Sequence, residues 1–74
     1  MLYEQELKEY KEMEEQLNNC SEFLDRVSIN ADMLDFSQNI YRELGFQLPE
    51  GKAPSYSRLK SAIKLYEQTI KNKQ

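Results

Sequence analysis

The sequence predicts an all-α fold, in which one long N-terminal helix and two shorter helices form a small helical bundle that dimerises. Apolar residues recur every three or four positions over residues 2–27, 31–44 and 56–72, which is the spacing of one helix face. Short stretches at 28–30 and 47–55 separate these segments, and no segment shows the alternation of a β-strand. At 74 residues the chain is expected to form one domain, 1–74.

The first predicted helix, about residues 2–27, has a narrow apolar seam. Seven steps of three or four residues cover 24 positions, an average of about 3.4, close to the coiled-coil value of 3.5. This seam is the expected core or dimer contact, and it consists of Tyr3, Leu7, Tyr10, Met13, Leu17, Cys20, Leu24 and Val27. Asn18, Asn19 and Ser21 are weak helix formers, but no Pro or Gly interrupts the segment.

The other faces of this helix are strongly acidic. At 1.5 Å per residue, about 25 residues make a rod of roughly 37 Å. Only three bases lie among its carboxylates, which are the expected partner-binding residues Glu4, Glu6, Glu9, Glu12, Glu14, Glu15, Glu22 and Asp25.

The second predicted helix runs from about residue 31 to residue 44. Asn30 is a suitable N-cap, and Gly45 is well placed to end the helix in a left-handed conformation. Phe46, directly after Gly45, can supply the apolar contact that accompanies such a cap. The predicted apolar face of this second helix consists of Met33, Leu34, Phe36, Ile40, Tyr41 and Leu44.

The third predicted helix covers about 56–72 and follows a loop that contains Pro49, Gly51 and Pro54. Ser55 is expected to cap its N-terminus. Its apolar face consists of Tyr56, Leu59, Ala62, Ile63, Tyr66 and Ile70.

The net charge of −3 conceals an uneven distribution along the chain. Residues 1–50 carry 12 acids and 4 bases, a balance of −8, whereas residues 51–74 carry 1 acid and 6 bases, a balance of +5. In one interpretation the basic C-terminal helix lies against the acidic helix and neutralises it. In the other, an acidic surface is presented to a basic partner. The two interpretations are compatible.

A chain of this size buries only about 60% of its unfolded surface, so its own core is marginal. Cys20 is the single cysteine and there is no His, which excludes an internal disulfide and zinc sites built from His and Cys. Association is the remaining source of stability, and we expect a homodimer. Cys20 lies on the seam and is interpreted as a small core residue. No apolar run is long enough to cross a bilayer, so a soluble, cytoplasmic protein is expected.

The sequence contains no pattern typical of an enzyme. Nucleophilic catalysis needs a base beside the nucleophile, and there is no His to serve as one. Neighbouring pairs such as Glu14 and Glu15 are expected to lie on a solvated face, where a catalytic separation of pKa values does not arise. There is no calcium-binding loop and no phosphate-binding Gly-rich loop, so no catalytic residue, metal or cofactor is predicted.

Three kinds of binding protein are compatible with these features. A small DNA-binding regulator would read DNA with the third helix, through Tyr56, Ser57, Arg58, Lys60, Ser61 and Lys64, although 13 acids would repel the phosphates. A coiled-coil-like adaptor would pair with itself along the first seam, most easily in an antiparallel arrangement. An inhibitor would imitate DNA on a basic protein and add an apolar anchor from the segment at Leu44 and Phe46. Direct nucleic-acid binding is the least favoured of the three.

The short, His-free, acidic, helical chain, rich in Asn, Gln, Lys and Tyr, resembles small host-takeover proteins of phages that infect low-GC bacteria. In length and charge layout it is similar to the staphylococcal phage inhibitors of the bacterial DNA sliding clamp. This resemblance implies a homodimer in the host cytoplasm that fills the clamp's DNA channel and covers its peptide groove. It also implies that the acidic helix faces the basic channel, with Leu44, Phe46 and Leu48 as groove candidates.

Overall fold

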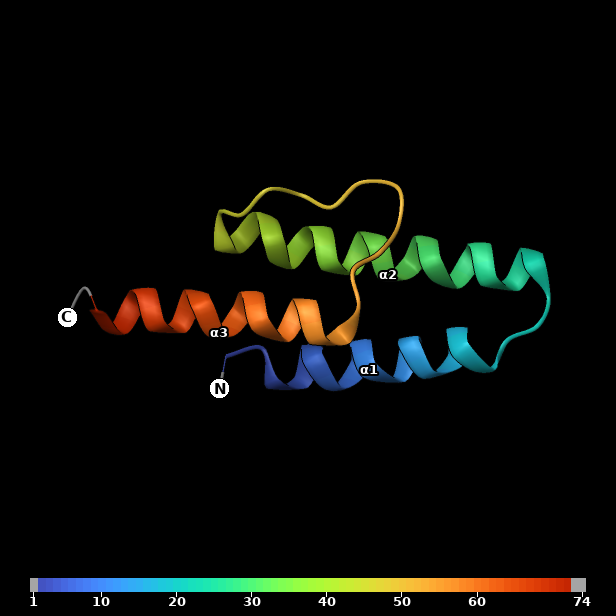
Figure 1. Ribbon diagram of the computed structural model, residues 1–74, viewed down its shortest axis with the longest axis horizontal. Helices are drawn as coiled ribbons and strands as arrows, with labels where there is room; N and C mark the ends of the chain where they lie inside the picture. The colour runs from blue at the N-terminus through green and yellow to red at the C-terminus, as the bar shows by residue number, and fades with distance from the viewer. Residues whose placement is uncertain (1, 73–74) are drawn as a thin grey trace.

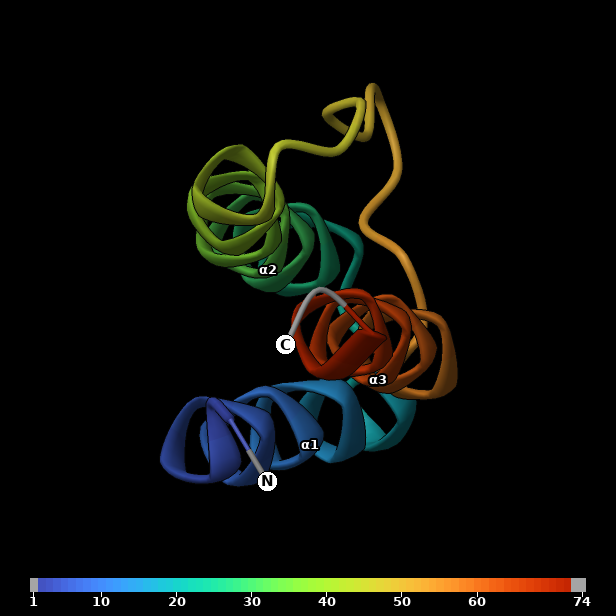
Figure 2. The same ribbon diagram turned by 90° about the vertical axis from the view of Figure 1, so that its left-hand side faces the viewer.

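The computed structural model describes residues 2–72 and contains three α-helices, α1 (Glu4–Asn19), α2 (Phe23–Leu44) and α3 (Tyr56–Asn72). The all-α prediction is therefore confirmed. In Figure 1, α1 and α2 form an antiparallel hairpin, and α3 runs in the same direction as α2. Figure 2, viewed nearly along the helices, shows α3 lying between α1 and α2. The molecule is elongated, with extents of 48 × 21 × 14 Å.

The prediction of one long N-terminal helix is wrong. The chain leaves the helical conformation at Cys20 and Glu22, whose backbones are extended (φ −89°, ψ 129° and φ −83°, ψ 132°). The Arg26 guanidinium stabilises this break, because its Nη1 donates to the carbonyls of Leu17 and Cys20, both at 2.9 Å. The weak helix formers before the break lower the cost of ending α1 there.

The break predicted at 28–30 is also wrong, because these residues lie inside α2. The chain folds back at residues 20–22, so the helix that packs against α1 starts at Phe23 and not after residue 30. Asn30 therefore does not cap a helix. Its side chain bonds to the loop after α2 instead, donating to the carbonyl of Gly51 at 3.4 Å and accepting from the N–H of Ala53 at 3.3 Å.

The local signals at the other helix ends are confirmed. Gly45 has φ 79°, and its N–H donates to the carbonyl of Arg42 at 3.2 Å. The N–H of Phe46 donates to the carbonyl of Tyr41 at 2.9 Å. These two bonds are those of a Schellman cap. Ser55 Oγ accepts from the N–H of Arg58 at 3.3 Å and so caps α3, whose bounds are the predicted ones.

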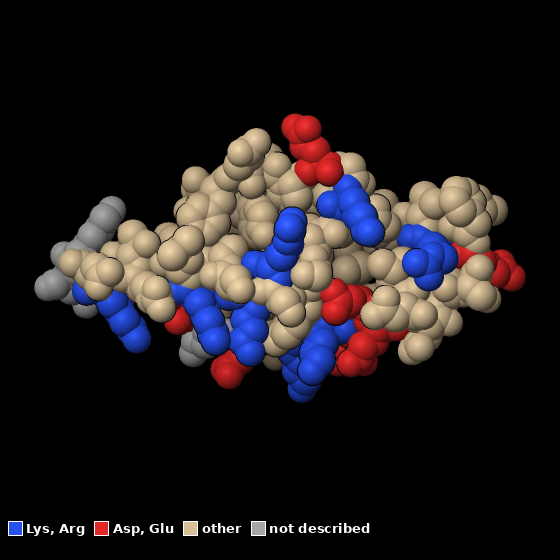
Figure 3. Space-filling model, viewed as in Figure 1, with Lys and Arg blue, Asp and Glu red and all other residues tan. Residues whose placement is uncertain are grey.

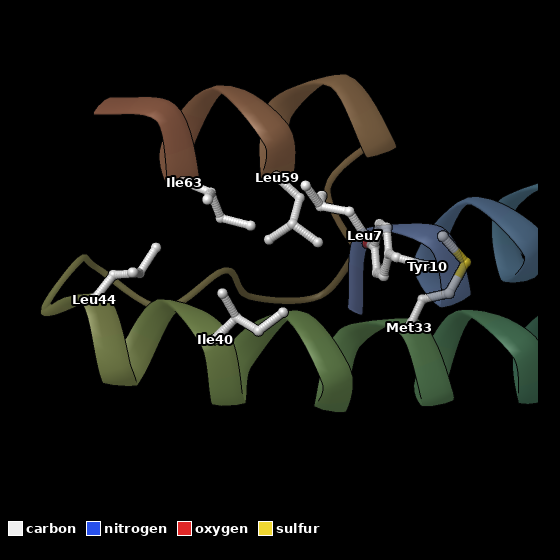
Figure 4. Packing of buried hydrophobic residues seen from close by; sticks show 7 residues of the cluster. All are labelled: Leu7, Tyr10, Met33, Ile40, Leu44, Leu59 and Ile63. Carbon is white, nitrogen blue, oxygen red and sulfur yellow. The ribbon is translucent and has the colours of Figure 1, made fainter. Parts of the chain in front are cut away.

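All three helices contribute to one hydrophobic core (Figure 4). Leu59 and Ile63 of α3 are fully buried, as is Tyr10 of α1. The Tyr10 ring lies 5.8 Å from that of Phe36, and its hydroxyl donates to the carbonyl of Pro54 in the loop. Burial raises the pKa of Tyr10 to about 12. The buried apolar residues of the core are Leu7, Tyr10, Met33, Ile40, Leu44, Leu59 and Ile63.

Candidate protein-interaction surfaces

The expected acidic residues do not form one continuous rod. The 16 residues of α1 span about 24 Å at 1.5 Å per residue, shorter than the predicted length. Glu22 lies in the break and Asp25 in the first turn of α2, and both are exposed. On α1 the exposed carboxylates are Glu4, Glu9, Glu12 and Glu15, which we call the acidic strip.

Glu14 has a structural role. It is half-buried, and its Oε2 accepts a hydrogen bond at 2.8 Å from the backbone N–H of Tyr56, the first residue of α3. A carboxylate at a helix N-terminus satisfies a free donor and interacts favourably with the helix dipole. Glu14 therefore joins α1 to α3 and is not available to a partner. Glu6 is also half-buried.

The basic helix α3 approaches the acidic strip at Glu4 and leaves the rest of the strip uncovered. A groove of about 470 Å³ between α1 and α3 brings Lys60 and Lys64 beside two lysines of α1, with Glu4 as the one acid among its lining residues. The ammonium groups of Lys11 and Lys60 lie 5.7 and 5.9 Å from the centre of the Tyr56 ring. Figure 3 shows Lys and Arg side chains gathered over α3 and the adjoining edge of α1. The carboxylates of Glu9, Glu12 and Glu15 stay exposed.

The apolar anchors expected at the end of α2 and in the loop after it are mostly engaged within the protein. Leu44 is 7% exposed and belongs to the core, so it cannot anchor a partner (Figure 4). Phe46 is half-buried and packs edge-on against Tyr41, with ring centres 6.4 Å apart. Leu48 is half-buried and lines a cleft of about 850 Å³ beneath the loop.

A different apolar surface, which sequence reasoning missed, lies at the start of α2. Phe23, Leu24 and Val27 are 76%, 77% and 50% exposed. Leu24 and Val27 were assigned to the N-terminal seam, of which Tyr3, Leu7, Tyr10, Met13 and Leu17 do belong to or pack against the core. Cys20, in the break, is half-buried. The signal that could have revealed this surface is the 3–4 spacing from Leu24 onward, which continues through Ala31 and Leu34.

At the other end of the molecule, separate apolar side chains of α3 are exposed. The C-terminal part of α3 extends beyond the ends of α1 and α2 (Figure 1). Ile70, which falls on the same helix face as the buried Leu59 and Ile63, lies in the last turn of α3. Ile70 is 36% exposed and Leu65 is 57% exposed.

Over residues 2–72, none of the helices combines the length and apolarity needed to cross a bilayer. Within the described part of the chain, no three His, Cys, Asp or Glu side chains converge to hold a metal ion. Comparison with protein-family models, curated proteins and solved structures finds no match.

Proposed function

We propose that this chain is a non-enzymatic, acidic helical protein that binds and inhibits a basic DNA-handling protein in the cytoplasm of a bacterial host. The bacterial DNA sliding clamp is the partner that the sequence resemblance indicates. In this proposal the acidic strip of α1 occupies the Lys- and Arg-lined DNA channel of the clamp and so prevents DNA from entering.

The observation that carries the proposal is the exposure of Glu9, Glu12 and Glu15 beside a basic helix that could have covered them. These side chains follow one another at a rise of about 4.5 Å along the helix axis. Phosphates follow one another every 3.4 Å or so along a DNA strand. A groove that attracts DNA would therefore also attract this strip, and salt would weaken the interaction.

Leu44 is not proposed to bind the peptide groove of the clamp, because its side chain is buried in the core. We further propose that the protein acts as a dimer, because a 74-residue chain has a marginal core and this one exposes large apolar side chains at the start of α2.

The test is binding of the purified protein to a purified bacterial sliding clamp by calorimetry, at low and at high salt. The decisive variant replaces Glu9, Glu12 and Glu15 by Gln. Each exposed ion pair contributes about 0.2–1 kcal/mol, so the three together should weaken binding roughly 3- to 150-fold. In a clamp-dependent primer-extension assay the same variant should inhibit less than the wild type.

The matched control replaces Asp32 and Asp35 by Asn and Glu50 by Gln, three exposed acids outside α1, and makes the same change in net charge. We expect this control to bind nearly as well as the wild type. Absence of binding at low salt would eliminate the clamp as the partner. Equal losses in both variants would show that net charge, and not the strip, drives the interaction.

A further inference from the structure

The groove between α1 and α3 gathers four lysines from two helices, and we call it the basic groove. Lys8 and Lys11 line it from α1 and are three residues apart. Lys60 and Lys64 line it from α3 and are four residues apart. Like charges at either spacing repel each other on a helix, and the packing of α1 against α3 adds repulsion between the two pairs. Glu4 is the one carboxylate among the lining residues, so an anion in the groove would relieve an unfavourable concentration of positive charge.

The ring of Tyr56 restrains one lysine from each helix. The ammonium groups of Lys11 and Lys60 lie 5.7 and 5.9 Å from the centre of this ring, within the range of attraction between a cation and an aromatic face. Tyr56 is itself held in place, because its N–H donates to Oε2 of Glu14 at 2.8 Å. The two ammonium groups are therefore positioned before an anion arrives, which lowers the entropic cost of binding.

Carboxylates border the basic groove on both helices and limit the anion that it can hold. Glu12 and Glu15 lie one turn beyond the two lysines of α1 and are exposed, and Glu67 lies three residues beyond Lys64 on α3. Glu14 faces α3, where its carboxylate already accepts a backbone N–H. A nucleic-acid strand or an acidic peptide that continued along α1 would meet the acidic strip, whereas a short anion would stay among the lysines. The bordering acids also offset part of the positive charge, so a ligand needs several negative charges to bind.

We propose that the basic groove binds a compact anion with several phosphate groups, either the phosphate chain of a nucleoside triphosphate or a free oligophosphate. Such a chain concentrates several negative charges within a few bonds, which suits four ammonium groups in a groove of about 470 Å³. The lysines bind as point charges that donate to phosphate oxygens. A peptide spreads its carboxylates over separate residues and matches this concentration less well. The site is a binding activity beyond the proposed function, which depends on the acidic strip.

The first experiment measures binding of inorganic phosphate, pyrophosphate and triphosphate to the wild-type protein by calorimetry, in a buffer of low salt without divalent cations. The affinity should rise with the number of phosphate groups, because a longer chain reaches more of the ammonium groups. Salt should weaken binding, since the lysines are at the surface. A triphosphate that does not bind, or that binds no more tightly than a single phosphate, would overturn the proposal.

The decisive variant combines Lys11→Gln with Lys64→Gln, which removes one exposed lysine of the groove from each helix. Loss of two exposed charge contacts should weaken triphosphate binding about 2- to 30-fold. The matched control combines Lys52→Gln with Lys71→Gln, two exposed lysines outside the groove, and makes the same change in net charge. The control should bind triphosphate as the wild type does, and both variants should keep the helical circular dichroism of the wild type. Equal losses in the two variants would overturn the groove as the site.

Two further ligands identify the source of the phosphate groups. ATP that binds more tightly than free triphosphate would assign a nucleotide, with its nucleoside against Tyr56 and Leu7 in the groove. Equal affinities would assign the phosphate chain alone, and weaker binding of ATP would assign a free oligophosphate. A short single-stranded oligonucleotide should bind more weakly than triphosphate. Tighter binding of the oligonucleotide would overturn the compact ligand and indicate a nucleic-acid surface. Clamp binding is tested separately, with the glutamate variants of α1, and does not depend on these results.

Discussion

The two faces of α2 are both apolar at helical spacing, but only one of them is buried. On the inner face, Met33 and Ile40 are 2% and 4% exposed, because α1 and α3 pack against them. On the outer face, Leu24 and Val27 are 77% and 50% exposed. The two faces do not differ in side-chain type. They differ in what the chain has available to cover them, since two helices are used on the inner face and one short loop on the outer.

The largest expected contrast between the faces is in stability. Ile40→Ala should lower the free energy of unfolding by about 2–5 kcal/mol, the usual cost of removing a buried aliphatic side chain. For a chain of 74 residues the total free energy of unfolding is only about 4–11 kcal/mol, so this variant should be partly or largely unfolded. Leu24→Ala should change the free energy by less than about 0.5 kcal/mol.

Both substitutions are best measured by urea denaturation in a Val27→Glu background, because a charge on the exposed apolar surface of α2 opposes the proposed dimerisation. Comparable losses at residues 24 and 40 would contradict the assignment of an uncovered outer face.

The next effect concerns Tyr10, which packs against the inner side of α2 through Phe36. Tyr10 has a pKa of about 12 in the folded protein, against an ordinary value of 10.0. Between these values the unfolded state releases the phenolic proton while the folded state retains it, so stability falls as the pH rises. The urea midpoint should be constant up to about pH 9 and then decrease.

Tyr10→Phe separates the two contributions of this side chain. At neutral pH it should cost about 1 kcal/mol, because the carbonyl of Pro54 loses its donor. Above pH 10 it should lose stability less steeply than the wild type. Some alkaline loss should persist, because the hydrogen bond to Glu43 raises the pKa of Tyr3 to about 12 as well. An unchanged slope in the variant would assign the alkaline loss to other groups.

The smallest effect concerns the loop that divides the outer face into a covered and a bare half. Asn30→Ala removes both side-chain hydrogen bonds to the loop, at Gly51 and Ala53. We expect a loss of about 0.5–1.5 kcal/mol. Hydrogen exchange at the amide of Ala53 should become faster.

Asn39→Ala is the matched control, since it makes the same change in helix propensity. The Asn39 side chain accepts only a 3.3 Å bond from the exposed Arg42. Equal exchange rates at Ala53 in the two variants would show that Asn30 does not hold the loop.

The candidate surfaces were only partly predictable. The exposure of Glu9, Glu12 and Glu15 follows from their positions opposite the seam, and the structure agrees. The positions of Glu14 and Leu44 do not follow from the sequence. Glu14 is two positions from Glu12 on the same helix, yet it caps α3 because that helix starts beside it. Leu44 was a candidate anchor because it forms an apolar segment with Phe46 just before the loop, but its side chain is buried in the core that the three helices share.

The sequence by itself determined the helical fold class, the cap at Gly45 and Phe46, and the start of α3 at Ser55, because these depend on spacing and on contacts within a few residues. Only the tertiary structure decided where the N-terminal helix ends. The steps from Cys20 to Leu24 and Val27 continue the seam of α1 and equally begin the apolar spacing on the outer face of α2. Apolar spacing has the same form on both sides of the break. The choice between one helix and two depends on which arrangement buries more apolar surface, and that is a property of the whole chain.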